Sequence, residues 1–269
     1  MTRNVTTTIE GGVAHLRLAR PEKLNALTLE MLDDLAEAAR RLRSERGLRS
    51  VILSGEGDSF CAGLDFGTAM KRPSRIVSHF VPRPWRGTNG FQEACWGLRR
   101  LPVPVIAAVD GHCLGGGLQI ALAADVRIAH PESTWSVLEG RWGIIPDMTG
   151  VHTLSELVGI DVAKKLTMTA AKISGTEAQR LGLVTDVAED PLTAAASLSE
   201  EIAQRSPDAV AAAKRLFDGT WRRGPWRTFA RERVEQVPLL FGENARRARE
   251  AHAARRSPDY RERSRRLVP

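Results

Sequence analysis

The chain's clearest chemical feature is a run of three glycines, Gly115–Gly117, which opens an apolar segment of helical composition at 118–124. Glycine lets a ligand come close to the backbone, and a helix N-terminus presents unpaired N–H groups and a positive dipole end. The combination favours binding of a negative oxygen, either of a phosphate or of an enolate. Close packing of the helix on a strand explains the same glycines without a ligand, and the run alone does not decide between the two.

Two carboxylates downstream are candidates for acid–base chemistry. Glu139 and Asp147 lie in a connection rich in glycine and proline, among tryptophan, leucine and isoleucine side chains. A carboxylate in apolar surroundings has a raised pKa and can act as a base or an acid. The alternatives are solvated loop carboxylates or helix caps, and Asp147 directly after Pro146 also suits a structural turn.

The elements around these residues follow a mixed α/β order. Strand, helix and strand in succession suggest parallel crossover units, and Thr28 is a suitable N-cap for a helix that ends at Gly47. The expected strands are 5–9, 13–18, 51–53, 103–109, 126–129 and 135–138, and the expected later helices are 91–100, 152–158, 160–169, 176–181, 192–205 and 207–218.

Two stretches depart from this order. Residues 67–92 hold several prolines and the aromatic residues Phe80, Trp85 and Phe91, so we expect an irregular segment whose aromatic side chains either line an apolar pocket or pack within the loop. After about residue 150 the pattern changes from mixed α/β to all-helical. From residue 221 onward the chain is rich in arginine and helical in composition.

Size and composition narrow the class of protein. A chain of 269 residues with 42% apolar content supports one large domain, or a domain with an appendage. No apolar run is long enough to span a membrane, and the N-terminus has no signal-peptide pattern. Three cysteines are an odd count at spacings unlike a metal site or a disulfide framework. We therefore expect a cytoplasmic protein with no membrane segment.

The positive charge is concentrated at the C-terminal end. Residues 221–269 carry 14 arginines against 6 acidic residues, whereas the net charge of the whole chain is +7. Nucleic acid is one partner that such a segment fits. Acidic residues are interspersed, however, and no recognition motif is present. The preferred interpretation is a solvated helical surface near an anionic ligand or a partner subunit, so no nucleic-acid partner is expected.

Several motifs together resemble those of the enoyl-CoA hydratase/isomerase family, also called the crotonase superfamily. No pattern for a serine-hydrolase elbow, a zinc-binding helix, a Walker loop or a dinucleotide fold is present. The resemblance covers about residues 5–220. It lies in RPEKLNAL (20–27), VILSGEGDSFCAGLD (51–65), PVIAAVDGHCLGGGLQIALAADVRIA (104–129), EGRWGIIPDMTG (139–150) and ISGTEAQRLGLVTDV (173–187).

This resemblance implies a fold and an assembly. The expected fold is α/β, a crotonase-like spiral of ββα units with a C-terminal α-helical region. We divide the chain accordingly into an acyl-CoA-binding core, residues 1–200, and a helical region, residues 201–269, which supports oligomerisation and covers the active site. The family also implies a homotrimer or a homohexamer.

The resemblance also implies the binding site. Family members bind an acyl-CoA thioester and stabilise its enolate with two backbone N–H groups, which correspond here to those of Leu64 and Gly116. Asp65, the next residue, either touches substrate or caps the following turn. The CoA is part of the substrate, so no metal or redox cofactor is expected. The adenine end of CoA would lie near a set of four substrate-binding residues: Lys23, Asn25, Ala26 and Ala62.

The reaction depends on two positions that the resemblance identifies. Hydratases of the family use two glutamates, and those positions hold Gln119 and Glu139 here. A glutamine cannot take a proton from water, although Gln119 can still position a water or a polar group of the substrate. A single glutamate is the pattern of the family's Δ3-Δ2-enoyl-CoA isomerases, and its dienoyl-CoA isomerases have an aspartate where this chain has Asp147.

We therefore expect isomerisation of a double bond in an enoyl- or dienoyl-CoA. Glu139 moves the proton in this hypothesis, with Asp147 as a second candidate for the transfer. Hydration of an enoyl-CoA and binding of acyl-CoA without catalysis are the alternatives.

Overall fold

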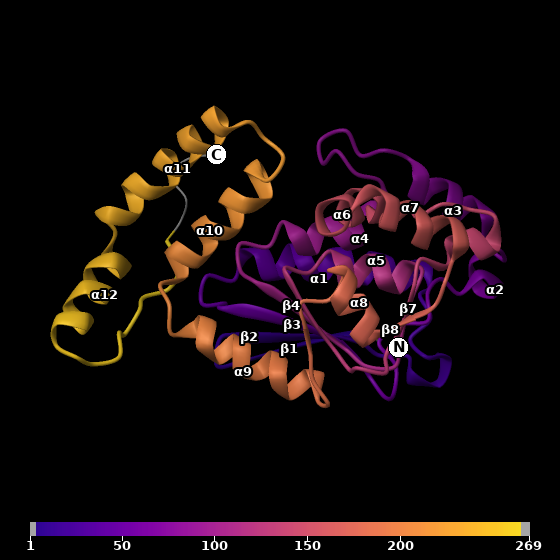
Figure 1. The fold of residues 1–269 in the computed structure, drawn as a ribbon, viewed down its shortest axis with the longest axis horizontal. Coiled ribbons are helices and arrows are strands. Elements are labelled where there is room, and N and C mark those ends of the chain that lie inside the picture. The colour runs from indigo at the N-terminus through magenta and orange to yellow at the C-terminus, as the bar shows by residue number, and fades with distance from the viewer. Residues whose placement is uncertain (1–3, 265–269) are drawn as a thin grey trace.

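The computed structural model describes residues 4–264, which fold around a mainly parallel six-stranded sheet (Figure 1). The first two strands, both expected from the sequence, pair antiparallel, and each later pair of neighbours is parallel. The predicted parallel crossover units are therefore confirmed. In spatial order, the strands are β1 (Val5–Glu10), β2 (Val13–Leu18), β3 (Ser50–Gly55), β4 (Val105–Val109), β6 (Val126–Ala129) and β9 (Asp186–Val187).

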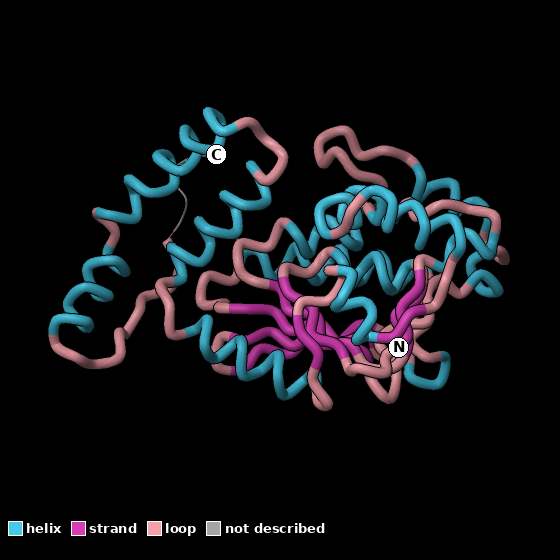
Figure 2. Tube along the Cα trace, in the orientation of Figure 1, coloured by secondary structure: helices cyan, strands magenta, loops and turns pink. Residues whose placement is uncertain are grey.

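Helices cover both faces of this sheet (Figure 2). Val51 and Leu53 of β3 belong to the larger apolar core, whereas Ile52 between them belongs to a second layer with Ala195. The sequence of a strand that is buried on both faces is a continuous apolar run, as is typical of a parallel sheet. The larger core includes α1 (Leu29–Ser44), α4 (Gly90–Arg99) and α5 (Gly116–Leu122), and the second layer includes α9 (Pro191–Ala203).

Helix α1 begins where the sequence predicts it. The Oγ1 atom of Thr28 accepts a hydrogen bond from the N–H of Met31 at 3.2 Å, which is the interaction that makes threonine a good N-cap. The helix ends at Ser44, slightly before the predicted end at Gly47. Its buried face packs on β1, β2 and α4.

A second, three-stranded sheet carries the segment before the glycine run. This segment forms a strand, residues 112–114, that is absent from the strands expected from the sequence. Backbone hydrogen bonds join that strand to Cys61, whose N–H donates to the carbonyl of His112 at 2.7 Å. The sheet contains β5 (His112–Leu114), β7 (Thr134–Ser136) and β8 (Ile173–Ser174), and α5 starts after β5.

Two further predictions about the elements are wrong. Residues 67–92 are not irregular throughout, because they include most of α2 (Phe66–Ala69) and all of α3 (Pro73–Phe80). Proline suits the first turn of a helix, and Phe80 packs on the buried ring of Phe91, with centroids 4.8 Å apart. The part after residue 150 is not all-helical either, because β8 and β9 pair with strands formed earlier in the chain.

The remaining helices lie on the connections and at the C-terminal end. Within residues 4–264, no helix is long and apolar enough to cross a membrane. These helices are η1 (Pro21–Lys23), η2 (Leu138–Trp142), α6 (Gly150–Leu157), α7 (Ile160–Thr169), α8 (Gly175–Leu181), α10 (Pro207–Thr220), α11 (Pro225–Leu240) and α12 (Glu243–Ala253).

Helices α10 to α12 form a C-terminal arm, residues 207–253, which projects from the sheet (Figure 1). Its first helix is joined to the core, because the Lys214 ammonium lies 2.6 Å from the Asp125 carboxylate and donates to the Val103 carbonyl at 3.0 Å. The predicted division between residues 200 and 201 falls in the last turn of α9. That division into two functional regions stays a prediction.

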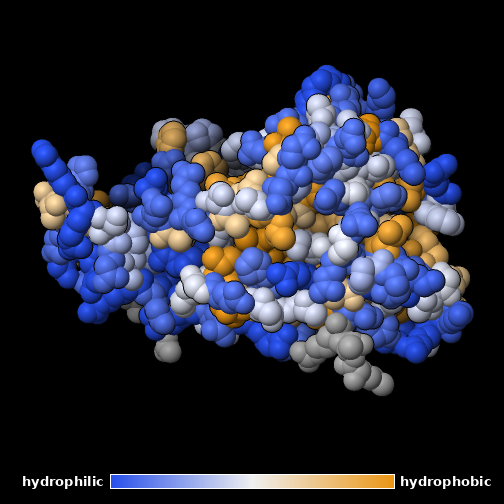
Figure 3. All heavy atoms as spheres, turned by 90° about the horizontal axis from the view of Figure 1, so that it is seen from below, coloured by the Kyte–Doolittle hydropathy of each residue, from blue (hydrophilic) through white to orange (hydrophobic). Residues whose placement is uncertain are grey.

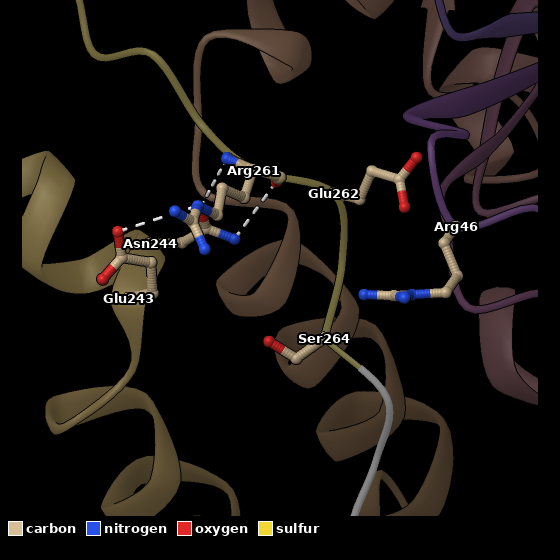
Figure 4. Close-up of a pocket in the computed structure, with 6 residues that line it drawn as sticks. All are labelled: Arg46, Glu243, Asn244, Arg261, Glu262 and Ser264. Atoms are coloured by element: carbon tan, nitrogen blue, oxygen red, sulfur yellow. Dashed lines mark hydrogen bonds and ion pairs between the residues drawn. The ribbon is translucent and has the colours of Figure 1, made fainter.

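A terminal segment, residues 257–264, returns from the arm to the core. The buried amide of Asn244 in α12 donates to Asp208 at 2.8 Å and to the Arg261 carbonyl at 3.2 Å, and it accepts from the Arg261 N–H at 2.8 Å. The Arg46 side chain donates to the Arg263 carbonyl at 3.0 Å. Figure 4 shows the pocket of about 570 Å³ at this junction, which is lined by Arg46, Glu243, Asn244, Arg261, Glu262 and Ser264.

We expect Asn244→Ala to release the terminal segment from the arm. The substitution removes three hydrogen bonds, while Ser264 still donates to Asp208, and a typical hydrogen bond contributes about 0.5–1.5 kcal/mol. Amide hydrogen exchange of residues 257–264 should become faster, and urea unfolding should show a loss of about 2 kcal/mol. Ser257→Ala, an exposed change in the same segment, is the control. Unchanged exchange in Asn244→Ala would contradict this account.

Candidate active site

Each of the three positions at the start of α5 holds glycine for a different structural reason. Gly115 has a φ of +51° and a ψ of −120°, a conformation that favours glycine. A Cβ on Gly117 would lie 2.5 Å from the Cβ of Cys61, so the packing explanation holds there. Gly116 is the first residue of the helix, and a Cβ on it would lie 3.1 Å from atoms of Leu27 and Met148.

Two free backbone N–H groups lie on adjacent segments near the start of α5. Segment 61–64 runs beside β5, since the Leu114 N–H donates to the Cys61 carbonyl at 3.0 Å and a Cβ on Gly63 would lie 3.0 Å from the Leu114 carbonyl oxygen. Leu64 ends this segment, and Gly116 begins α5. Among the described residues, the N–H groups of Leu64 and Gly116 have no acceptor. Free amides of this kind can stabilise an anionic oxygen.

The side chain of Gln119 lies between Glu139 and the turn that precedes α6. Its Nε2 donates to Oε1 of Glu139 at 2.6 Å, and its Oε1 accepts from the N–H groups of Met148 and Gly150, each at 2.8 Å. Gln119 and Glu139 are 1% and 6% exposed. A Cβ on Gly115 would lie 3.6 Å from Oε1 of Glu139, so this carboxylate adjoins the start of α5.

Glu139 keeps one oxygen free. Its Oε2 is buried and accepts no hydrogen bond within residues 4–264. Burial raises the pKa of Glu139, the hydrogen bond from Gln119 opposes that shift, and the negative charge of Asp147 adds to it. A buried carboxylate with a raised pKa and an unpaired oxygen is suited to accept a proton at neutral pH.

Asp147 faces the same region from the following turn. It is half-buried, and burial raises its pKa above the ordinary value for aspartate. Its charge acts on Glu139, so the two carboxylates that the sequence singled out lie within electrostatic range of each other. Among the described residues, no group of three His, Cys, Asp or Glu side chains is arranged so that it could hold a metal ion.

The predicted CoA-binding residues lie on two adjoining segments. The Ala62 N–H donates to the Leu24 carbonyl at 2.9 Å, which places Ala62 beside the 23–26 turn. Lys23 is exposed, whereas Ala26 and Ala62 are half-buried. The structure therefore brings these three together, and their contact with a CoA moiety stays a prediction.

Asn25 differs from its neighbours in this turn. It is completely buried, and its amide nitrogen donates to the carbonyls of Glu56 and Ser59 at 2.9 and 2.7 Å. Its Oδ1 accepts from the Arg20 N–H at 2.8 Å. This buried side chain ties the turn to the loop after β3. A contact of Asn25 with a CoA moiety stays a prediction.

Asp65 caps α2, which is one of the two roles that the sequence suggested for this residue. Its carboxylate accepts from the Thr68 N–H at 3.0 Å and from the Thr68 hydroxyl at 2.9 Å, and it pairs with Arg20 at 2.8 Å. Burial alone would raise the pKa of Asp65, but these hydrogen bonds hold it below the ordinary value. A contact of Asp65 with substrate stays a prediction.

Sequence reasoning missed Met148 and Gly150. Both act through backbone N–H groups, which no side-chain type reveals. A Cβ on Gly150 would lie 2.6 Å from Oε1 of Gln119, so glycine is needed for the turn to approach that amide. The available signal was the glycine at the end of PDMTG, which is ordinarily interpreted as a turn residue.

Comparisons with known proteins agree with this architecture. The family model described as Enoyl-CoA hydratase/isomerase matches residues 8–263. The short-chain-enoyl-CoA hydratase of Clostridium acetobutylicum is 36% identical over 218 residues, which are 80% of this chain and 81% of that protein. The (E)-benzylidenesuccinyl-CoA hydratase of Thauera aromatica is 33% identical over 224 residues, which are 78% and 80%.

A solved structure shows the same similarity in three dimensions. The crystal structure of an enoyl-CoA hydratase from Mycobacterium tuberculosis H37Rv aligns with a TM-score of 0.84 and 31% sequence identity, and the alignment covers 97% of this chain and 99% of that one. This similarity confirms the fold class that the sequence predicted.

We expect Glu139→Gln to stabilise the folded protein at neutral pH. The folded-state pKa of Glu139 is raised, so wild type loses stability as the pH rises through that pKa, whereas the variant does not. The difference in Tm should therefore grow as the pH rises above 4.5, the ordinary pKa of glutamate, and should level off once the pH exceeds the raised folded-state pKa. Glu132→Gln, which removes an exposed carboxylate, is the matched control. Equal Tm values across this range would show that the Glu139 charge is not destabilising.

Proposed function

Because the chain belongs to the enoyl-CoA hydratase/isomerase family, we propose that this acyl-CoA enzyme moves a proton along the chain of an enoyl- or dienoyl-CoA thioester and so shifts its double bond. The observation that carries the proposal is the environment of Glu139. Its Oε2 is buried and unpaired within the described residues, while its hydrogen-bonded neighbour is the amide of Gln119 and not a second carboxylate.

The proposed mechanism uses the two free amides and one base. The thioester oxygen accepts hydrogen bonds from the N–H groups of Leu64 and Gly116, and each such donor contributes roughly 3–4 kcal/mol as negative charge develops. Oε2 of Glu139 removes a proton from the carbon next to the thioester carbonyl, and an enolate forms. Glu139 then returns this proton to a carbon further along, or a protonated Asp147 donates one there and recovers a proton from Glu139 before the next turnover, so the double bond moves with no net gain or loss of protons. No redox cofactor enters this balance, and CoA stays attached to the substrate.

The contacts of Gln119 favour proton transfer over hydration. Addition of water by two carboxylates requires the second group to exchange a proton with the water. The Nε2 atom of Gln119 already donates to Glu139, and its Oε1 accepts from two backbone N–H groups. An amide in this arrangement has no proton to exchange near neutral pH.

The proposal is tested by Glu139→Gln on a panel of 3-enoyl-CoA, 3,5-dienoyl-CoA and crotonyl-CoA. We expect kcat for isomerisation to fall by about 10²- to 10⁴-fold, because a positioned general base is lost. Asp147→Asn should lower turnover of the dienoyl substrate more than that of the 3-enoyl substrate, because the longer transfer needs a second carboxylate. Substantial hydration of crotonyl-CoA by wild type that is insensitive to Glu139→Gln would refute the mechanism.

Hydration is the second candidate, and the names of the relatives favour it, since the proteins from C. acetobutylicum and T. aromatica are both named hydratases. Under our proposal, Gln119→Glu should create or strongly raise hydration of crotonyl-CoA, because it supplies the second carboxylate. If wild type already hydrates crotonyl-CoA through Glu139, hydration is the function. Tight acyl-CoA binding with no turnover on the whole panel would instead identify a non-catalytic binding protein.

We also propose that the chain works as a cytoplasmic homotrimer or homohexamer. Several large apolar side chains on the arm are more than half exposed in the single chain, and unpartnered groups of this kind mark interfaces. Figure 3 shows apolar surface gathered near the middle of one face of the molecule. The exposed side chains on the arm and just after α10 include Phe217, Trp221, Trp226 and Phe241.

No nucleic-acid partner is part of this proposal. Several arginines of the arm are paired with acids, as in Arg231 with Glu235 at 2.7 Å and Arg246 with Glu243 at 2.7 Å. Paired guanidinium groups are less available for phosphate contacts, which are the main source of affinity for nucleic acids.

A further inference from the structure

The orientation of the Gln119 amide is fixed by its partners. Backbone N–H groups can only donate, so the atom that faces Met148 and Gly150 has to be the amide oxygen, and each of those distances is 2.8 Å. The amide nitrogen is thereby directed to Glu139, where it donates to Oε1 at 2.6 Å. In the flipped orientation, the NH₂ group of the amide would face the N–H donors of Met148 and Gly150.

The two N–H groups that Gln119 accepts flank a strained residue. Thr149 has a φ of +79°. A β-branched residue rarely adopts this left-handed conformation, which costs of order 1–3 kcal/mol. Met148 precedes it and Gly150 follows it, so Gln119 holds the turn on both sides. The contact is close, because even a Cβ on Gly150 would lie 2.6 Å from the amide oxygen.

The result is an asymmetric carboxylate. Oε1 of Glu139 accepts the short hydrogen bond, whereas Oε2 accepts none within the described residues although it is buried. We propose that Gln119 is a positioning residue, which fixes Glu139 so that Oε2 is the oxygen that exchanges the proton and which ties that carboxylate to the 148–150 turn. This inference rests on the proposed role of Glu139 as the base.

A carboxylate at position 119 would keep the contact with the 148–150 turn but would lose the hydrogen bond to Glu139. It could accept the N–H groups of Met148 and Gly150 as the amide oxygen does. Its second oxygen would face Oε1 of Glu139, and two carboxylates so close share one proton. The other titratable groups near Glu139 are Asp147 and the buried thiol of Cys95, and burial keeps that thiol neutral by raising its pKa. Gln119→Glu therefore separates the two parts of the role.

The test compares wild type with Gln119→Met and Gln119→Glu. Amide hydrogen exchange at Met148 and Gly150 reports the turn without any substrate, and kcat, KM and the pH profile on 3-enoyl-CoA report the base. In Gln119→Met we expect exchange at both amides to be about tenfold faster and kcat to fall by about tenfold or more, with KM within about threefold of wild type. Gln179→Met, a change at a partly exposed glutamine on α8, is the matched control.

Gln119→Glu should give a different pattern. Exchange at Met148 and Gly150 should stay near the wild-type rate, while the acid limb of the kcat/KM profile moves to higher pH because Glu139 and the new carboxylate share a proton. Wild-type exchange rates in Gln119→Met, or faster exchange with unchanged kcat, would overturn the inference. If wild type turns over no acyl-CoA, the proposed function fails and takes the role in catalysis with it, whereas the exchange rates still decide whether Gln119 holds the turn.

Discussion

The burial of one ionisable carboxylate is the constraint on which the rest of the site depends. An unpaired charge away from water is costly, and proteins ordinarily satisfy it with several donors or neutralise it. Glu139 receives one short hydrogen bond, while its other oxygen stays without a donor inside the described part of the chain. The α5 N-terminus beside it presents N–H groups and a positive dipole end, which reduce the cost without occupying the free oxygen.

The parallel sheet and its small companion sheet make this arrangement possible. Segments from distant parts of the sequence meet at one point because β5 pairs with the chain at Cys61 on one side and with β7 on the other. The amide of Leu64, the start of α5 and the Glu139 turn are thereby set side by side on backbone hydrogen bonds. Side chains such as that of Asn25 reinforce the same junction from below the surface.

The parts of the fold that were predictable are those with a periodic or compositional signal. The hairpin, α1 and the parallel order follow from apolar spacing and from Thr28, and the motifs around Gly116 and Glu139 identified the family. Strands β5, β8 and β9 were missed because two or three residues are too few to show alternation. The hydrogen bonds that fix the Gln119 side chain could not be predicted, because backbone N–H groups donate them. The burial of Asn25 could not be predicted either, because it depends on a loop far away in sequence.

The chemistry of position 119 has an evolutionary consequence. Glutamine and glutamate have the same length, and both can accept the N–H groups of Met148 and Gly150, so the strained turn at Thr149 does not depend on which of them is present. A single nucleotide change converts a codon of one into a codon of the other. The scaffold can therefore pass between one-carboxylate and two-carboxylate sites without rebuilding its backbone, and a lineage can exchange one reaction for another while its fold remains under unchanged selection.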